Sequence, residues 1–278
     1  MKIVNKNIAI VTSSLTAPGA TMLQQAFAAR GQTADIVLLG DGYSAAGRIN
    51  TSDIVILRIG PKSFAMYRDT VLPSLENVKH KKLLTRMLEA FDKSIQTQKL
   101  RDRHVPVPAT RIIHDISELS PWLPCVLKQP TGNQGNGVFL VHDEESAKQT
   151  ARQLIASSGS CIQQEYIHIR PATDKRLFVV GDTVVAAMKR TAHGADFRSN
   201  LHQGGSSEAY TPLPNERNIA VRAAQALELP FCGVDIIDGP AEPLVLEVNP
   251  SPGFAIAQTT GIAVPDIIAQ HYIEGVLE

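Results

Sequence analysis

The sequence predicts a mixed α/β (α+β) protein, in which a first unit of alternating strands and helices is followed by antiparallel hairpins. Three short apolar runs separated by helix-forming stretches occupy the first 60 residues, and this alternation is typical of a parallel sheet. Farther along, apolar runs flank turn residues such as Gly181-Asp182 and Asp238-Gly239-Pro240, which is the pattern of β-hairpins. The 278 residues are enough for two or three structural units.

Composition excludes several classes of protein. The 27 Lys and Arg residues balance the 27 Asp and Glu residues, so no general attraction to nucleic acid or to an anionic membrane is expected. No apolar stretch approaches the length of a membrane span, and we expect a cytoplasmic protein. Cys125, Cys161 and Cys232 are widely spaced within or beside apolar runs. We interpret them as small core residues rather than as redox or zinc-binding residues.

The first unit is expected to hold three strands and one helix. The strands fall at residues 7–12, 35–39 and 53–59, and the helix falls at residues 20–30. Pro18-Gly19 lies between a strand and a helix but forms neither a dinucleotide fingerprint nor a P-loop, so no nucleotide is expected there. Arg58 stands at the carboxyl end of the third strand, where such sheets often carry a ligand crevice. The plainer interpretation is an exposed arginine without a ligand.

Residues 71–102 are rich in helix formers and charge. The basic run of residues 79–82 is interpreted as a solvated helix face, with a phosphate or partner contact as the alternative. A helix is expected to begin at Asp92-Lys93 and to end at Asp102. The following sequence VPVP, residues 105–108, forces an extended conformation and is interpreted as a linker.

A glycine-rich segment is the second stretch of the sequence that indicates a binding site. A strand at residues 124–128 ends in Lys128 and enters residues 129–137, which contain three glycines, before a strand at residues 138–141. Such a loop lets backbone N–H groups approach an anion, so we interpret it as a phosphate-covering loop, with a merely mobile hairpin as the alternative. The elements expected next are a helix capped by Asp143, a strand at residues 161–167, and a hairpin of residues 175–180 and 183–189.

The hairpin of residues 233–254 carries the strongest site signal. Side chains alternate between the two faces of a strand. If odd residues pair with odd residues, one face therefore gathers Asp235, Ile237, Val245, Glu247 and Asn249. The other face would then be wholly aliphatic and would pack into a core, through Val234, Ile236, Leu244, Leu246 and Val248. Two carboxylates and an amide oxygen near one point suit magnesium or manganese. The alternative is that they are ordinary solvent-facing strand residues.

The order of these motifs resembles that of a known family over roughly residues 53–262. The motifs are RIG at 58–60, DK at 92–93, VPVPAT at 105–110, LKQPTGNQGNGV from 127, QEYI at 164–167, VVGDTVVAAMKR from 179, DFRSNLHQGG from 196, GVDII from 233, LEVNPSPG from 246 and TTGI from 259. In this order they resemble the ATP-grasp carboxylate–amine ligases, and they are most similar to the RimK family of ribosomal-protein modification and alpha-L-glutamate ligases.

The resemblance implies an ATP-grasp fold preceded by an N-terminal pre-ATP-grasp α/β domain. We assign residues 1–82 to that domain, residues 83–120 to a helical linker region, residues 121–185 to the middle or lid subdomain, and residues 186–278 to the metal-binding subdomain. ATP is expected between the last two. The RimK branch also implies a homo-oligomer, a homotetramer in the nearest relatives.

The resemblance assigns roles to individual residues. Lys93 and Lys128 match the lysines that hold the ATP phosphates, and Gly135 and Gly137 belong to the covering loop. The remaining correspondences are Glu165 and Tyr166 at adenine, Asp174 at the ribose or the amino edge, Arg190 and Arg198 as catalytic cations near the γ-phosphate, Ser199 and Asn200 in the nucleotide-binding run, and Asp235, Glu247 and Asn249 as ligands of Mg²⁺ or Mn²⁺, with two ions expected.

The implied activity is ATP-dependent ligation through an acyl phosphate. Glutamate or another amino acid would be joined to a protein or peptide C-terminus, with neither a nucleic acid nor a membrane as partner. The alternatives are a small-molecule ligase that makes a dipeptide, a cofactor or an amino-acid intermediate, and a non-catalytic ATP-binding regulator. Two departures from the family pattern lie where substrates bind: Gln203 stands where a basic residue is usual, and residues 254–258 lack the usual charges. Residues 79–82 also differ from the usual stretch, which contains Asn. Fewer charges near the acceptor would suit a less charged or a smaller substrate.

Overall fold

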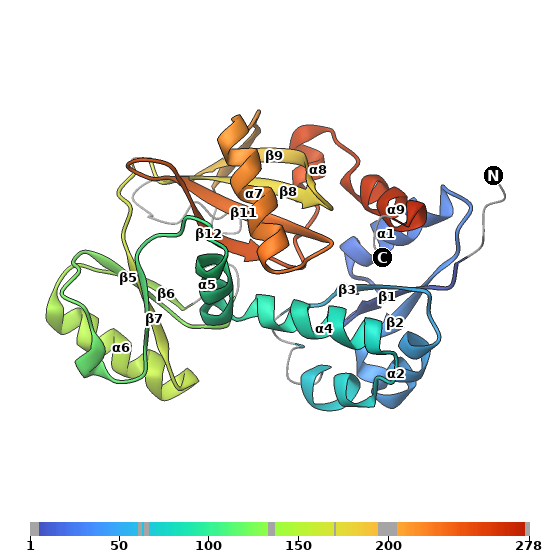
Figure 1. Cartoon of the computed structure of the whole chain (residues 1–278), viewed down its shortest axis with the longest axis horizontal. Helices are drawn as coiled ribbons and strands as arrows, with labels where there is room; N and C mark the ends of the chain where they lie inside the picture. Colours follow the sequence, from blue (N-terminus) through green and yellow to red (C-terminus); the bar gives the residue numbers. More distant parts are fainter. Residues whose placement is uncertain are drawn as a thin grey trace.

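The computed structural model describes residues 6–60, 63, 67–132, 137–169, 171–193 and 205–275. Within these residues the strands form a three-stranded, a four-stranded and a five-stranded sheet, and the helices pack around them (Figure 1). No helix in the described ranges is long and apolar enough to cross a membrane.

The N-terminal sheet is parallel and has the order β2-β1-β3. Its strands are β1 (Ile8–Thr12), β2 (Ala34–Leu38) and β3 (Ile54–Arg58), and its helices are α1 (Pro18–Ala28) and α2 (Tyr43–Asn50). The strand β1 is buried along its whole length, which explains its uninterrupted apolar sequence. The predicted parallel α/β unit is therefore confirmed, while α2 was not foreseen.

Two helices connect this sheet to the rest of the chain. After the short helical turns η1 (Leu39–Asp41), η3 (Tyr67–Val71) and η4 (Leu72–Ser74), the chain forms α4 (Val78–Phe91) and α5 (Lys93–Asp102). The predicted start of α5 is confirmed, because the Asp92 carboxylate caps it by accepting from the N–H of Ser94 at 2.7 Å. The prediction of a fully solvated face at residues 79–82 is wrong for His80, whose buried ring lies 2.7 Å from the carbonyl oxygen of Ser52.

The four-stranded sheet has the order β4-β7-β5-β6, all antiparallel. It consists of β4 (Thr110–Ile113), β5 (Cys125–Lys128), β6 (Val138–Val141) and β7 (Cys161–Glu165), with the turn η5 (Ile116–Glu118) and the helix α6 (Glu144–Ser158). Asp143 caps α6 as predicted, by accepting from the N–H of Ser146. Cys125 and Cys161 lie in the core under α6, and Cys232 is buried in the next sheet, so their prediction as core residues is confirmed.

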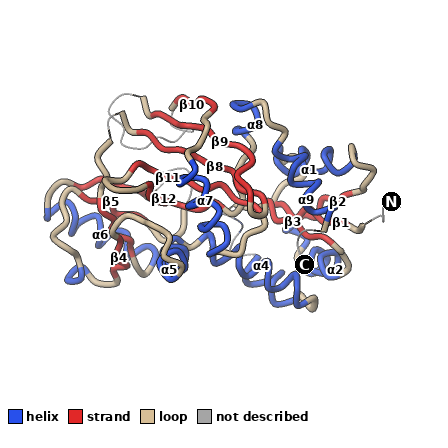
Figure 2. Tube along the Cα trace, turned by 45° about the horizontal axis from the view of Figure 1, so that its top comes forward, coloured by secondary structure: helices blue, strands red, loops and turns tan. Residues whose placement is uncertain are grey.

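The five-stranded sheet has the order β10-β9-β8-β11-β12. Its strands are β8 (Thr173–Val180), β9 (Thr183–Thr191), β10 (Ser206–Ala209), β11 (Phe231–Asp238) and β12 (Pro243–Asn249), and its helices are α7 (Pro214–Ala226), α8 (Ala255–Thr260) and α9 (Val264–Glu274). In both views α9 lies beside α1 (Figures 1 and 2). The two helices share a hydrophobic core. Arg30, two residues beyond the end of α1, also forms an ion pair with Asp266 of α9, which ties the C-terminal helix to the N-terminal unit.

The β11–β12 hairpin departs from simple alternation at one point. Asp235 pairs with Glu247, as the odd-with-odd register requires, but a bulge follows and Ile236 pairs with Val245. The bulge turns Val245 into the core, where it is 1% exposed, and leaves Leu244 and Leu246 half-buried. The prediction that Asp235 and Glu247 share a face is therefore confirmed, but it is wrong for Val245, which lies in the core, and the predicted aliphatic core face is wrong at Leu244 and Leu246.

Two of the predicted domain boundaries fall inside elements. The boundary after residue 82 lies within α4, and the one after residue 185 lies within β9. The strand β9 pairs along its length with β8, and strand pairing passes from the four-stranded to the five-stranded sheet between β7 and β8. We therefore propose that the middle and C-terminal units divide between residues 165 and 173.

Gln96 on α5 offers a test of how the helices are fixed to the sheet. Its amide donates to the carbonyl oxygens of Ala90 and Val248, and its oxygen accepts from the N–H of Val248, each at 2.7 Å. The side chain is buried, so Gln96→Leu should leave three backbone groups without partners and lower the free energy of unfolding by about 3 kcal/mol. Urea denaturation measures the loss.

The matched control is Gln98→Leu, because Gln98 is exposed on the same helix and bonds only to Asp102. We expect this control to change the free energy of unfolding by less than about 0.5 kcal/mol. Equal losses of unfolding free energy in the two variants would show that the buried hydrogen bonds of Gln96 contribute no more to stability than the exposed contact of Gln98.

Candidate active site

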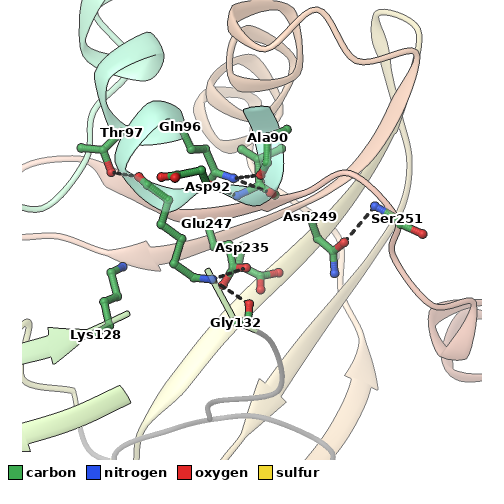
Figure 3. Close-up of polar contacts among 12 residues, drawn as sticks. Ala90, Asp92, Gln96, Thr97, Lys128, Gly132, Asp235, Glu247, Asn249 and Ser251 are labelled. Carbon is green, nitrogen blue, oxygen red and sulfur yellow. Dashed lines mark hydrogen bonds and ion pairs between the residues drawn. The ribbon is translucent and has the colours of Figure 1, made fainter. Parts of the chain in front are cut away.

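Two carboxylates from neighbouring strands form the centre of the candidate site. Asp235 on β11 and Glu247 on β12 are direct cross-strand partners, and Asn249 lies two residues farther along β12. Asn249 is held by its own loop, because its side-chain oxygen accepts from the N–H of Ser251 at 2.9 Å. Figure 3 shows Asp235 and Glu247 together, with Asn249 to one side. The structure thus brings the two predicted acidic ligands together and places the amide on the adjoining stretch.

Two arginines neutralise the buried Asp235. Arg176 on β8 donates two hydrogen bonds of 2.7 Å to its two oxygens, and Arg190 on β9 lies 2.9 Å from one of them. Burial on its own would raise the pKa of the Asp235 carboxyl, but the two guanidinium groups outweigh burial and hold that pKa at about 2. Arg190 also forms a two-point pair with Asp174. The result is an alternating row of Arg176, Asp235, Arg190 and Asp174.

Two lysines from different elements approach the carboxylates. Lys93 begins α5 and Lys128 ends β5, and they are only 8% and 7% exposed. The Lys93 ammonium donates to the carbonyl oxygen of Gly132 at 2.9 Å and lies 3.4 Å from a Glu247 oxygen. Burial, and then the charge of Lys93, lower the pKa of Lys128 to about 8. Two desolvated ammonium groups beside a carboxylate form a strong local field for a polyanion.

Glutamine side chains hold these charged groups in place. Gln164 on β7 accepts from the Lys128 ammonium at 3.1 Å and donates to the Thr110 hydroxyl at 3.0 Å. Gln96 fastens α5, and hence Lys93, to the backbone of β12 at Val248. Sequence reasoning missed Arg176, Gln96 and Gln164. Their partners are distant in the sequence, 152 residues away in the case of Gln96. No local sequence pattern therefore predicts the roles of these three residues.

The other predicted site residues are spread around this centre. Glu165 is exposed at the end of β7, Tyr166 is half-buried next to it, and Gly137 adopts a positive φ of 69° before β6. Both oxygens of Asp174 accept from Arg190, so the carboxylate predicted to contact the ribose or the amino edge is already paired with an arginine. Four predicted residues lie outside the described residues: Gly135, Arg198, Ser199 and Asn200.

The oxygen donors fit a hard cation. In the described part of the chain, no group of three His, Cys, Asp or Glu side chains is placed to hold a metal ion. The predicted set is two carboxylates and one amide, and Mg²⁺ is commonly bound by one or two carboxylates and completed by water and phosphate oxygens. Glu247, with its side chain 38% exposed, is the more accessible carboxylate. Asp235 is buried, and both of its oxygens are paired with arginines.

Comparisons with known proteins place the chain in one family. Residues 76–272 match the model of the RimK-like ATP-grasp domain. A probable alpha-L-glutamate ligase 2 of Shewanella denitrificans is 34% identical over 95% of this chain and 94% of its own length. A probable alpha-L-glutamate ligase of Stutzerimonas stutzeri is 39% identical over 79% of this chain and 75% of its own length.

Solved structures agree on the fold. D-cycloserine synthetase superimposes with a TM-score of 0.76 at 19% identity and covers 97% of this chain and 99% of its own. D-alanine–D-alanine ligase of Bacillus anthracis superimposes with a TM-score of 0.71 at 16% identity, and the match covers 97% of this chain and 96% of the ligase chain. A RimK domain ATP-grasp protein of Sphaerobacter thermophilus superimposes with a TM-score of 0.68 at 22% identity. The match covers 95% of this chain and 98% of that protein. The predicted ATP-grasp fold is confirmed.

The lowered pKa of Lys128 generates a prediction about pH. The side chain is charged below about pH 8 and neutral above it, and only the charged form attracts phosphate. The dissociation constant of an ATP analogue should therefore be flat below about pH 7.5 and should rise about tenfold per pH unit above about pH 8. Calorimetric titration across this range measures it. In Lys128→Arg, which keeps its charge, the rise should disappear, and a rise that persists would contradict the assignment of Lys128 to phosphate.

Proposed function

Because this chain belongs to the RimK-like ATP-grasp family, we propose that it adds glutamate to the C-terminal carboxylate of a protein or peptide. It is an ATP-grasp ligase that forms C–N bonds, and ATP-grasp ligases generally use ATP with Mg²⁺ or Mn²⁺. The support for glutamate comes from relatives named probable alpha-L-glutamate ligase, at 34% to 39% identity. The observation that carries the chemistry is the pair of buried lysines beside Glu247.

We assign the phosphate-binding role to Lys93 and Lys128. As compact ammonium groups they attract phosphate oxygens without demanding one geometry. Lys93 lies 2.9 Å from the carbonyl oxygen of Gly132, so the lysine and the glycine-rich segment are held together at the edge of the site. Glu165, Tyr166 and Asp174 are assigned to the nucleoside, as the family resemblance implies.

Glu247, Asn249 and Asp235 would hold one or two divalent cations. A bound cation would neutralise charge on the phosphoryl group in transfer. The carboxylate of the acceptor peptide attacks the γ-phosphorus to give an acyl phosphate and ADP. The amine of the amino acid then displaces phosphate to form the amide and loses a proton. Arg176 and Arg190 are assigned to the negative charge that develops in both steps, so catalysis here consists chiefly of positioning and electrostatics.

The lack of charge at residues 254–258 does not favour a small, uncharged substrate. Phe254 and Ile256 are 6% and 0% exposed, and both pack in the core shared by α1 and α9. Core packing therefore accounts for their apolar character. Gln203, the other departure from the family pattern, lies outside the described residues. A small-molecule ligase therefore remains the second candidate function. The formation of a homo-oligomer is a separate prediction, which the family resemblance implies.

The proposed function is tested by ADP release and mass spectrometry. Purified protein is incubated with Mg-ATP, a panel of single amino acids and peptides with different C-terminal residues. We expect ADP release that depends on both glutamate and a peptide, with a product heavier by one glutamyl residue. Turnover with free amino acids alone would establish the small-molecule alternative. Absence of ADP release with any pair, despite ATP binding, would favour the regulator.

A matched pair of variants ties turnover to the site. Glu247→Gln removes a charge beside Lys93, whereas Glu242→Gln removes one from the exposed turn of the same hairpin. The first should lower kcat by about 100-fold or more, since charge stabilisation by a bound cation is worth several kcal/mol. The second should leave kcat unchanged. Full activity of Glu247→Gln would remove that residue from the proposed metal site.

A further inference from the structure

Arg58 links the N-terminal sheet to the loop that leaves the active site. It ends β3, and one terminal nitrogen of its guanidinium, Nη2, donates to the carbonyl oxygen of Pro252 at 2.8 Å. The guanidinium carbon lies 4.6 Å from the centre of the Phe254 ring. Both contacts are made to the segment that follows β12, the strand that carries Glu247 and Asn249.

The charge of Arg58 has no counter-ion among the described residues. Its Nε and Nη1 atoms are buried and have no hydrogen-bond partner. Burial lowers the pKa of the guanidinium to about 10, so the group is still charged at neutral pH. A sheltered cation with unused donors is costly unless an anion satisfies it. The unpaired Nε and Nη1 donors of Arg58 therefore indicate a binding site for an anionic group.

The first turn of α1 contributes to the same place. At position 19 a Cβ atom would lie only 2.6 Å from the Nη2 atom of Arg58, so Gly19 leaves room for the guanidinium against the helix. The helix α1 begins at Pro18, and its first turn has neither an acidic residue nor a side-chain cap. The positive end of the helix thus adds to the charge of Arg58 instead of cancelling it.

The position of Arg58 relative to the two carboxylates indicates which molecule would carry the anionic group. Pro252 lies against Gly233, and its Cβ atom would be 3.1 Å from a Cβ at that position, where the side chain of Arg176 also lies within 3.5 Å. Arg176 in turn holds Asp235. Pro252, in the short loop after Asn249, therefore contacts Arg58 and also lies against β11, the strand that carries Asp235.

We propose that Arg58, together with the first turn of α1, binds a carboxylate of the incoming amino acid. This inference rests on the proposed function, in which the amine-bearing substrate is glutamate and carries two carboxylates. One of the two binds at Arg58 while the amine faces the acyl phosphate. A planar guanidinium with unused N–H groups suits a carboxylate better than a single-atom anion. The N-terminal unit thereby takes part in the selection of the amino acid.

Equilibrium binding tests the proposal without relying on turnover. Calorimetry is performed with L-glutamate, with glutamine, which lacks the side-chain carboxylate, and with isoglutamine, which lacks the α-carboxylate, in the presence of Mg²⁺ and a non-hydrolysable ATP analogue. The wild-type protein should bind glutamate about 10- to 100-fold more tightly than one of the two amides. Which amide binds weakly identifies the carboxylate held at Arg58. In Arg58→Met, glutamate and that amide should bind equally.

Two further variants separate recognition from folding. Arg58→Lys keeps the charge and should retain part of the preference. Arg30→Met is the matched control, because Arg30 also joins the N-terminal unit to the C-terminal part, through Asp266, but it lies beyond the opposite end of α1 from Gly19. It should retain the full preference. Thermal unfolding of all variants checks that they are folded.

The outcomes separate this inference from the proposed reaction. A preference that survives in Arg58→Met, an equal loss of affinity for all three ligands, or a wild-type protein that binds glutamate no better than either amide would overturn the carboxylate site. If binding behaves as expected but no glutamyl product forms, the carboxylate site stands and the proposed reaction fails. A glutamyl product together with an unchanged preference in Arg58→Met rejects the site and leaves the reaction standing.

Discussion

The candidate active site is built around two carboxylates that the β11–β12 register places directly opposite each other. Like charges at such a position destabilise a sheet, and Asp235 is buried as well. The neighbouring strands supply the compensation, since Arg176 and Arg190 project from β8 and β9 onto Asp235. Glu247 is instead approached by Lys93 from outside the sheet. The charge that this sheet concentrates is therefore balanced by arginines from the adjacent strands, the same arginines that we propose act on the substrate.

The same contacts fix the parts of the site relative to one another. Lys93 stands on a helix that Gln96 fastens to β12, and the backbone N–H of Lys93 donates to the carbonyl oxygen of Pro130 at 2.8 Å. Lys93 is thus joined to Pro130 and Gly132 by hydrogen bonds and to Glu247 by an ion pair. In phosphoryl transfer the protein contributes mainly by positioning and by preorganised charge, and such cross-links hold the charges in place before substrates arrive.

The sequence was most informative where a local rule decides the structure. Alternation along a strand was enough to place Asp235 and Glu247 on one face, and Asp92 and Asp143 marked the starts of their helices. The bulge after Asp235 could not be predicted, because it arises from how β12 meets its neighbours and not from its composition. Arg176 was missed for a related reason: in the sequence it is one more charged residue of a strand, and only the pairing of β8 with β11 gives it a partner. Arg58 was noticed for its place at a strand end, but its unused donors became visible only with Pro252 and Gly19 beside it.

The location of the bound metal is the most direct test of this arrangement. We would measure the anomalous scattering of Mn²⁺ in crystals grown with a non-hydrolysable ATP analogue. We expect manganese within coordination distance of oxygens of Glu247 and Asn249, with the analogue's phosphates against Lys93 and Lys128 and Asp235 partly released from its arginines. Manganese bound elsewhere, or phosphates that contact neither lysine, would contradict the proposal that this hairpin and these two lysines form the catalytic centre.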